Sequence, residues 1–274
     1  MLADLDRTLR ARYGVDERTL DSTRISTRRR AVRIVVPVRL HVITNGNRGR
    51  LSAEVVRRLI ATLNEAYGGK KGGADTGVSF RLEKYGVRDN ALWFRAPERY
   101  EAAMKKALRR GGAETLNLYT AAVGSDMLGF STFPQWYRKE PHNDGVVVDY
   151  RSVPGGSFRH FNFGYTAVHE IGHWLGLFHT FENACDNPGD GVADTPFEAG
   201  PTEKCPLLRD TCWQLGTDPV HNFMNYGWDD CMREFTPGQG LRIRAAWAAF
   251  RAPGQESERR HSARTGARSV SGAR

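Results

Sequence analysis

The chain has 274 residues, of which 40% are hydrophobic and 26% are charged, and its net charge is +9. This composition is typical of a soluble globular protein, and no apolar run approaches the roughly 18 residues needed to cross a membrane. The positive charge lies mainly at the two ends, with +4 in residues 1–33 and +3 in residues 252–274. The nearly neutral middle argues against nucleic acid as a partner.

The composition divides the chain into three parts. Residues 1–32 are polar and rich in Arg, which predicts an N-terminal extension or pro-segment with a short helix near residues 2–12. They begin with Met-Leu-Ala-Asp, which does not have the pattern of a secretory signal peptide. Residues 33–251 carry the hydrophobic periodicity of a folded domain. The Ser- and Arg-rich residues 252–274 are expected to be a disordered basic tail.

Strand and helix patterns alternate through residues 33–179. Short β-branched and aromatic runs predict strands, whereas Ser52 and Pro97 begin helices that end at paired glycines. The predicted strands are 33–43, 78–85, 91–94, 115–121, 128–133 and 146–150, and the predicted helices are 53–67, 98–110 and 163–176.

Residues 180–236 are rich in Gly, Pro, Asp and Cys and have little periodicity. A long segment without secondary structure usually counts against an assignment, but covalent cross-links or an ion could order this one. Thr236, Pro237 and Gln239 then form a capping-box pattern, which predicts a last helix that ends near Arg251. The whole chain is therefore predicted to have an α+β fold.

The clearest chemical signal is HEIGHWLGLFH, residues 169–179, which fits the motif H-E-x-x-H-x-x-G-x-x-H. His169 and His173 are four residues apart, so a helix places both imidazoles on one face. Gly176 can end the helix and turn the chain, which brings His179 to the same ion. Three neutral imidazoles bind zinc and leave its fourth position open for water. Incidental histidines would rarely match so many fixed positions.

The residue beside the first histidine, Glu170, can act as a general base. It would take a proton from the attacking water and deliver it to the departing amine, as a zinc hydrolase requires. One alternative from another class is an inactive binding module of the same fold. The presence of Glu170 together with all three histidines argues against it.

Two further residues fit such a site. Met224 lies 45 residues after the last histidine, where a methionine turn could form an apolar floor beneath the metal. Tyr226 follows two residues later and could donate a hydrogen bond to the oxyanion. A methionine that fills the core and a packed aromatic ring are the simpler alternatives.

The four cysteines, Cys185, Cys205, Cys212 and Cys231, all lie within 47 residues and form no CxxC pair. An even number in a loop-rich segment predicts two disulfides and an oxidising compartment. The residues themselves leave all three possible pairings open.

These motifs resemble the pappalysin family of metzincin metalloproteases, most closely its small bacterial members. The resemblance covers roughly residues 33–245 and rests on HEIGHWLGLFHTF, GDGVADTP, DPVHNFMNY and DDCMREFTPGQ. It implies a secreted, monomeric zinc endopeptidase that cleaves proteins or peptides, with structural calcium and no membrane partner. It also implies an upper subdomain (33–179) with a twisted mixed sheet, a backing helix and an active-site helix, and an irregular, disulfide-linked lower subdomain (180–251).

The resemblance also assigns roles to individual residues. It pairs Cys185 with Cys212 and Cys205 with Cys231. It makes Asp190, Asp194 and Thr195 candidate calcium ligands, and it makes the strand containing Gly129, Phe130, Ser131 and Thr132 the edge that pairs with substrate. Asp230, with Asp229 as a substitute, would select Arg or Lys just after the cleaved bond.

The N-terminal segment departs from the family pattern. Relatives often carry R-C-G there, and its thiolate blocks the zinc until the segment is removed. This chain has Arg12-Tyr13-Gly14, so a cysteine latch is excluded. Self-cleavage near Arg28, Arg29 and Arg30 is a hypothesis that follows from the expected basic specificity.

Overall fold

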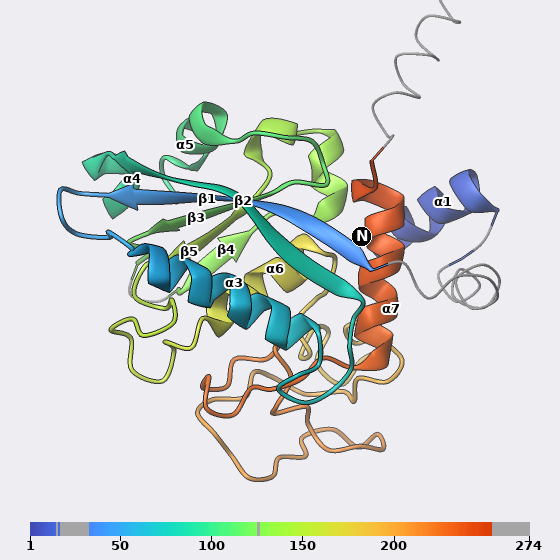
Figure 1. Cartoon of the computed structure of the whole chain (residues 1–274). Helices are drawn as coiled ribbons and strands as arrows, with labels where there is room; N and C mark the ends of the chain where they lie inside the picture. Colours follow the sequence, from blue (N-terminus) through green and yellow to red (C-terminus); the bar gives the residue numbers. More distant parts are fainter. Residues whose placement is uncertain (15, 17–32, 125–126, 254–274) are drawn as a thin grey trace, which may run out of the picture.

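A computed structural model describes residues 1–14, 16, 33–124 and 127–253 (Figure 1). Two segments with sequence-based predictions, Arg28–Arg30 and residues 254–274 of the basic tail, lie outside the described residues. Among the helices that are described, none is both long and apolar enough to cross a lipid bilayer.

The described chain is built on a twisted sheet with the strand order β2-β1-β3-β5-β4. Strand β4 runs antiparallel to β5 and lies at one edge, and the other neighbouring pairs are parallel, so the predicted mixed sheet is confirmed. The strands are β1 (Ile34–Thr44), β2 (Val78–Asp89), β3 (Leu116–Ala121), β4 (Gly129–Ser131) and β5 (Val146–Asp149).

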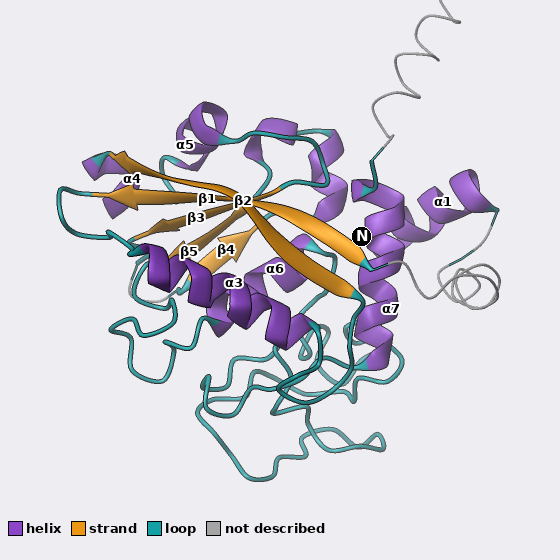
Figure 2. Ribbon diagram, in the orientation of Figure 1, coloured by secondary structure: helices purple, strands orange, loops and turns teal. Residues whose placement is uncertain are grey.

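Helices cover the two faces of the sheet unequally (Figure 2). On one face, α3 (Ala53–Tyr67) and α6 (Tyr165–Trp174) bury the main core, to which β1 contributes Val38 and Leu40. Ser52 accepts a hydrogen bond from the Val55 N–H and so begins α3, as predicted.

The opposite face is covered by α4 (Ala91–Arg95) and α5 (Glu101–Leu108), which pack on Tyr119 and Val147. The prediction of a strand at residues 91–94 is wrong. The side chain of Asn90 accepts hydrogen bonds from the next turn and caps a short helix there, and so short an apolar run does not distinguish the two states. Helix α5 is also shorter than the predicted 98–110.

Residues 180–236 contain no helix or strand of their own, as predicted, and form the loops at the bottom of Figure 1. Disulfides join Cys185 to Cys212 and Cys205 to Cys231. The same segment contains Glu198, whose carboxylate is fully buried. It accepts hydrogen bonds from Thr180 (3.0 Å), Thr202 (2.6 Å), Arg209 (2.6 Å) and Asn225 (2.8 Å). Covalent and polar contacts therefore order this half in place of secondary structure.

The C-terminal helix α7 (Pro237–Ala246) begins with the predicted capping box and continues as a π-helical turn, η4 (Trp247–Arg251). Helix α1 (Leu2–Tyr13) lies beside it in Figure 1. Leu5 and Leu9 are buried against Ala245 and Ala249, so the predicted N-terminal helix is present and packs on the domain rather than extending into solvent.

Candidate metal centre and substrate cleft

Helix α6 presents the first part of the motif. It ends at Trp174, and Gly176 then adopts φ +101°, a backbone conformation that residues other than glycine rarely adopt. A Cβ at Gly176 would also lie 2.8 Å from the Cβ of Ala246. The glycine therefore lets the chain turn closely past α7 and return His179 toward the helix.

The three motif histidines converge. Nε2 of His173 lies 3.2 Å from Nε2 of His169 and 3.1 Å from Nε2 of His179. Among the residues that the structure describes, this is the one group of three or more His, Cys, Asp or Glu side chains close enough to share a metal ion. The nitrogens therefore fit a divalent cation bound by imidazole.

The outer nitrogens of two histidines are held in place. Nδ1 of His169 donates to the carbonyl oxygen of Phe223 at 2.8 Å, and Nδ1 of His173 donates to that of Leu177 at 2.8 Å. These bonds leave Nε2 of each ring unprotonated and aimed at the shared position. These partners could not be predicted from the sequence, because every residue has a main-chain carbonyl group.

Burial keeps the three histidines neutral. It lowers the pKa of His173 to about 4 and that of His179 to about 3, with His173 adding to the effect on His179. The pKa of His169 also falls well below its usual value, first through burial and then through the other two imidazoles. Neutral imidazole is the form that binds a metal.

Glu170 lies in the same cavity as the three histidines. Burial raises the pKa of its carboxyl to about 8. Gly129 of the edge strand lies directly beside it, since a Cβ there would be 2.8 Å from Cγ of Glu170 and 2.9 Å from the carbonyl oxygen of Val147. The absence of a side chain at Gly129 thus permits the close approach of β4 to α6.

Met224 and Tyr226 flank the histidines. Met224 is fully buried, and a Cβ at Gly172 would lie 2.3 Å from its sulfur, so the methionine packs closely on α6. The hydroxyl of Tyr226 lies 3.1 Å from Nε2 of His179, and its side chain lines the cavity. The structure therefore brings both residues to the metal centre.

The cleft around the histidines has a volume of about 530 Å³. Apolar walls surround a few polar groups, as is usual for a ligand site. Its lining consists of Met127, Leu128, Gly129, Phe161, Tyr165, Thr166, His169, Glu170, His173, His179, Asn225, Tyr226, Gly227, Asp229 and Met232.

The structure separates the two candidate acids. Asp229 lines the cleft and is 2% exposed, and its Oδ1 has no hydrogen-bond partner within the described chain. Burial raises its pKa to about 7, although backbone N–H groups, including that of Phe163 at 2.7 Å, oppose the rise. The Asp230 side chain is 49% exposed and pairs with His160 at 3.3 Å. It is not among the residues that line the cleft.

The loop after the metal motif holds the three candidate calcium ligands. Asp194 accepts hydrogen bonds from the Thr236 hydroxyl (2.7 Å) and the Gly238 N–H (2.8 Å), so it caps α7. Asp190 and Thr195 are buried, and Oδ2 of Asp190 and Oγ1 of Thr195 lack a hydrogen-bond partner in the described residues. These oxygens are suitable for a hard cation.

Strand β4 forms one wall of the cleft. Its Phe130 lies opposite Val147 of β5, and the flanking hydrogen bonds run from Thr132 N to Gly145 O and from Asp149 N to Leu128 O. By the alternation of an antiparallel ladder, the main-chain groups of Gly129 and Ser131 point to the free edge.

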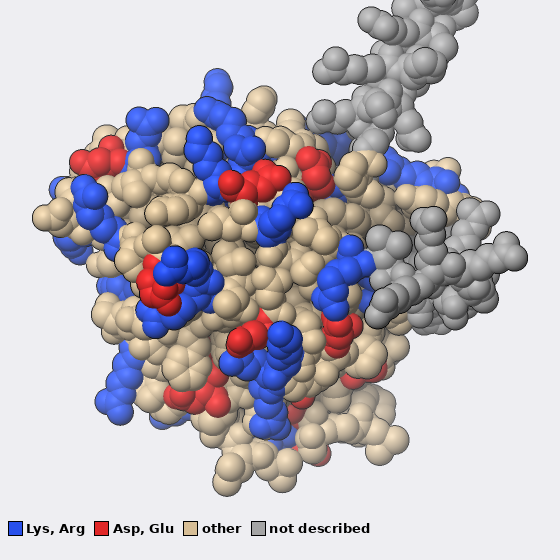
Figure 3. Space-filling model, viewed as in Figure 1, with Lys and Arg blue, Asp and Glu red and all other residues tan. Residues whose placement is uncertain are grey.

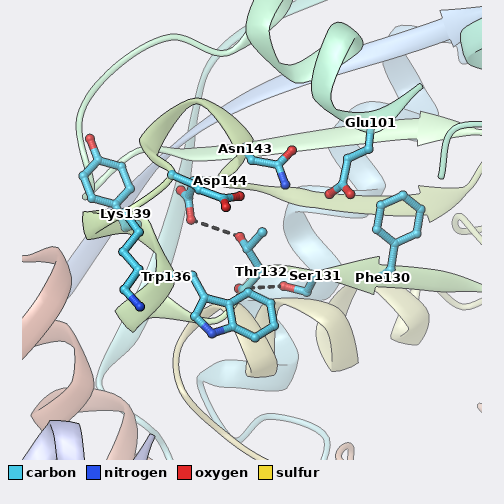
Figure 4. A pocket seen from close by; sticks show the side chains of 10 residues that line it. Glu101, Phe130, Ser131, Thr132, Trp136, Lys139, Asn143 and Asp144 are labelled. Carbon is cyan, nitrogen blue, oxygen red and sulfur yellow. Dashed lines mark hydrogen bonds between the residues drawn. The ribbon is translucent and has the colours of Figure 1, made fainter. Parts of the chain in front are cut away.

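A second cavity, of about 360 Å³, adjoins this strand on the side of α5. Figure 4 shows Phe130 and Glu101 together on one side of it and Trp136 below Thr132. At its back the Thr132 hydroxyl donates to Asp144 at 3.0 Å.

Comparisons with known proteins agree with this geometry. The family model described as pregnancy-associated plasma protein-A, peptidase family M43, matches residues 130–248. An extracellular metalloprotease of Arthroderma gypseum is 39% identical over 225 residues, which are 80% of this chain and 74% of the relative. One from Neurospora crassa is 40% identical over 226 residues, 80% of this chain and 76% of the relative.

Comparison with solved structures also finds similar proteins. Mature mirolysin of Tannerella forsythia, in complex with a cleaved peptide, superposes with a TM-score of 0.69 at 27% identity, covering 77% of this chain and 90% of mirolysin. A promirolysin structure superposes at 0.71 and covers 91% of this chain and 92% of its own, but its 24% identity supports the fold alone.

Proposed function

Because the chain belongs to the pappalysin family of metalloproteases, we propose that it is an extracellular zinc endopeptidase with Glu170 as general base and a preference for Arg or Lys just after the cleaved bond. The observation that carries this proposal is the convergence of His169, His173 and His179 in a cleft that also contains a buried glutamate.

Zinc held by the three imidazoles would supply a Lewis acid for the scissile carbonyl and activate water at neutral pH. Glu170 takes the proton of the attacking water and passes it to the departing amine nitrogen. The Tyr226 hydroxyl, 3.1 Å from Nε2 of His179, donates a hydrogen bond to the oxyanion as it forms. The apolar walls of the cleft limit competing water around these groups.

Substrate binds as an added strand on β4. The free N–H and C=O groups of Gly129 and Ser131 pair with an extended peptide whatever its sequence. Gly129 brings this added strand beside Glu170, so the scissile bond lies next to the base. Phe130 and Thr132 point to the other face, and the cavity of about 360 Å³ lies within reach of side chains two to four residues from the scissile bond.

Specificity for a basic residue rests on Asp229 rather than on Asp230. The oxygen Oδ1 of Asp229 is buried and unpartnered within the described residues, and the carboxyl lines the metal cleft. A guanidinium or ammonium group would form a charge-assisted hydrogen bond there. Asp230 already has a partner in His160 at the surface.

A structural calcium ion is also part of the proposal. Asp190 and Thr195 would supply side-chain oxygens, and Asp194 would hold the loop against α7. The extracellular location is supported by the names of the fungal relatives and by the two disulfides. The expected substrates are proteins and peptides, and the expected state is a monomer.

Replacement of Glu170 with Ala tests the base. We expect the variant to retain one zinc per chain by elemental analysis and to lose at least about a hundredfold in peptide hydrolysis. Glu203→Ala, at an exposed position of the lower half, is the matched control and should be fully active. Hydrolysis by Glu170→Ala within a few-fold of wild type would show that Glu170 is not the base.

Asp229→Asn and Asp230→Asn form a matched pair for the specificity. Only Asp229→Asn should abolish the preference for Arg or Lys over Leu after the cleaved bond, measured on a peptide library. Loss of the preference in Asp230→Asn alone would reject the role of Asp229.

A further inference from the structure

The sheet carries another pocket, at the edge opposite the metal cleft. Val38 and Leu40 of β1 point into the main core, so Arg39 and His41 point to the other face. The second half of β2 is exposed, and together the two strands form the floor of a cavity of about 370 Å³. It is lined by Arg39, Leu40, His41, Lys84, Tyr85, Gly86, Val87, Arg88, Leu108 and Arg110.

The charged side chains of this lining all have the same sign. Four are Lys or Arg, namely Arg39, Lys84, Arg88 and Arg110, and none of the lining residues is Asp or Glu. They come from three separate segments, β1, β2 and the residues after α5. In Figure 3, Lys and Arg side chains gather along the top of the molecule around α5, with fewer Asp and Glu among them.

A register shift in the sheet produces this arrangement. Val38 pairs with Leu82, but Arg39 pairs with Lys84, so Glu83 is skipped and bulges out of the ladder. Without the shift, the partner of Arg39 would be the oppositely charged Glu83. Bulges redirect side chains, and like charges in paired positions of neighbouring strands destabilise a sheet. The bulge therefore places two cations together on the floor of the pocket.

Internal partners offset these charges only in part. Glu83 lies 3.4 Å from Arg39, but it is also within 3.6 Å of Arg81, so one carboxylate serves two guanidinium groups. Nε of Arg39 is buried and has no hydrogen-bond partner among the described residues. Within the same residues, the side chains of Lys84 and Arg88 form no hydrogen bond or ion pair.

The positive charges also affect the pKa of the neighbouring His41. His41 stacks on Tyr119, with ring centroids 4.6 Å apart, and shares a hydrogen bond of 3.0 Å with Asn117. Burial lowers its pKa despite the Asn117 contact, and Arg110 and Arg39 lower it further. The His41 imidazole is therefore a neutral part of the pocket lining that its contacts hold in place, and the arginine and lysine side chains provide the charge.

From this geometry we propose that the pocket is an anion-binding exosite for a sulfate or phosphate ester group carried on an anionic polysaccharide. Arg binds the oxygens of such groups in a fork, and Lys adds a point charge. A concave site with donors from three segments suits a compact tetrahedral group that has acceptor oxygens on all sides. Since β2 and β4 are opposite edges of the sheet, a polysaccharide bound here would hold the enzyme on a surface while the cleft stays open.

The test uses the full chain and a fully sulfated oligosaccharide as the probe, titrated by calorimetry. Arg39→Gln/Lys84→Gln removes two charges from the pocket. Arg7→Gln/Arg57→Gln removes two from exposed sites on α1 and α3, where these side chains are 76% and 71% exposed. The basic ends of the chain are the same in both variants. We expect the pocket variant to weaken binding at least tenfold and the control to weaken it less than about twofold.

Additional measurements keep the inference testable if the double variant folds poorly. Arg88→Gln alters an exposed residue at the end of β2 and should weaken binding at least threefold. Inorganic sulfate should compete with the oligosaccharide, and hydrolysis of a small peptide should not change in any variant. Equal weakening by both double variants, or equally tight binding of a poly-glutamate peptide, would overturn the proposal, because either result would indicate general charge attraction. A pocket that bound inorganic sulfate but did not bind the oligosaccharide would also overturn it.

Discussion

We expect a buried ion pair behind the edge strand to be among the largest single contributions to stability. Arg251, at the end of η4, and Asp144 both have side chains with no exposed surface, and Nη2 of Arg251 lies 3.0 Å from Oδ1 of Asp144. Arg251 also donates to the carbonyl oxygens of Trp174 (2.8 Å) and Ala113 (2.9 Å) and stacks on the Trp174 ring at 3.5 Å. Asp144 also accepts from Trp174 Nε1 at 3.2 Å and from Thr132 at 3.0 Å. The pair therefore joins η4 to α6 and to the residues that follow β4.

The replacement Arg251→Met keeps most of the side-chain volume but leaves the Asp144 carboxylate buried without the guanidinium group that it contacts. Removal of one partner of such a pair destabilises a protein by about 3–5 kcal/mol. For a domain of this size, that corresponds to a decrease in melting temperature on the order of 10 °C. Asp144→Asn should have an effect of similar size, because it leaves the guanidinium buried and unpaired.

Urea unfolding of the two single variants and of the double variant measures the coupling. We expect the double variant to be about as stable as either single one, because it leaves no unpaired buried charge. The exposed pair of Arg57 and Glu54, 71% and 58% exposed, is the control and should contribute less than about 1 kcal/mol. Additive effects in the buried pair, or single effects below about 1 kcal/mol, would refute this reasoning.

Four further predictions concern the cleft and the loop after it. Since the pKa of Asp229 is raised to about 7, its carboxyl is mostly neutral at pH 6 and mostly charged at pH 8. The ratio of kcat/KM for Arg substrates to that for Leu substrates should therefore rise between pH 6 and pH 8 in wild type. The same ratio should not change with pH in Asp229→Asn. The same shift means that wild type should lose stability relative to Asp229→Asn as pH rises from about 4 to about 7, because folding favours the protonated carboxyl. Gly129→Ala should keep its zinc but lose at least about tenfold in kcat/KM, since the added Cβ would lie 2.8 Å from Glu170 Cγ; activity close to wild type would mean that β4 can move away freely. Calcium should raise the melting temperature of wild type but not of Asp190→Asn, and an unchanged wild-type melting temperature across calcium concentrations would exclude the ion.

The metal centre could be predicted from the sequence because its geometry is local. A spacing of four residues on a helix and a glycine at the turn determine where His169, His173 and His179 lie relative to one another. Strand β5 was predictable for a similar reason, since its run of three valines is β-branched and buried on both faces.

The choice between Asp229 and Asp230 could not be made from the sequence. Adjacent residues point in different directions, and in an irregular segment no periodicity indicates which one faces the cleft. The path of the backbone turns Asp229 into the cleft, through the bonds of Asp229 N to His160 O and of Phe163 N to the Asp229 carboxylate, and this is the reason that we propose Asp229. The pocket at Arg39 and Lys84 could not be predicted from the sequence either, because it depends on a register shift between strands that are distant in sequence.

The metal ligands belong to two parts of the protein that are stabilised in different ways. His169 and His173 stand on a helix packed against the sheet, whereas His179 begins the segment that is ordered by Glu198 and the cross-links. Zinc affinity should therefore report on the integrity of that segment. A reductant that opens the cross-links would release the ion while the sheet is still folded, so the enzyme would lose activity in a reducing environment well before it unfolds.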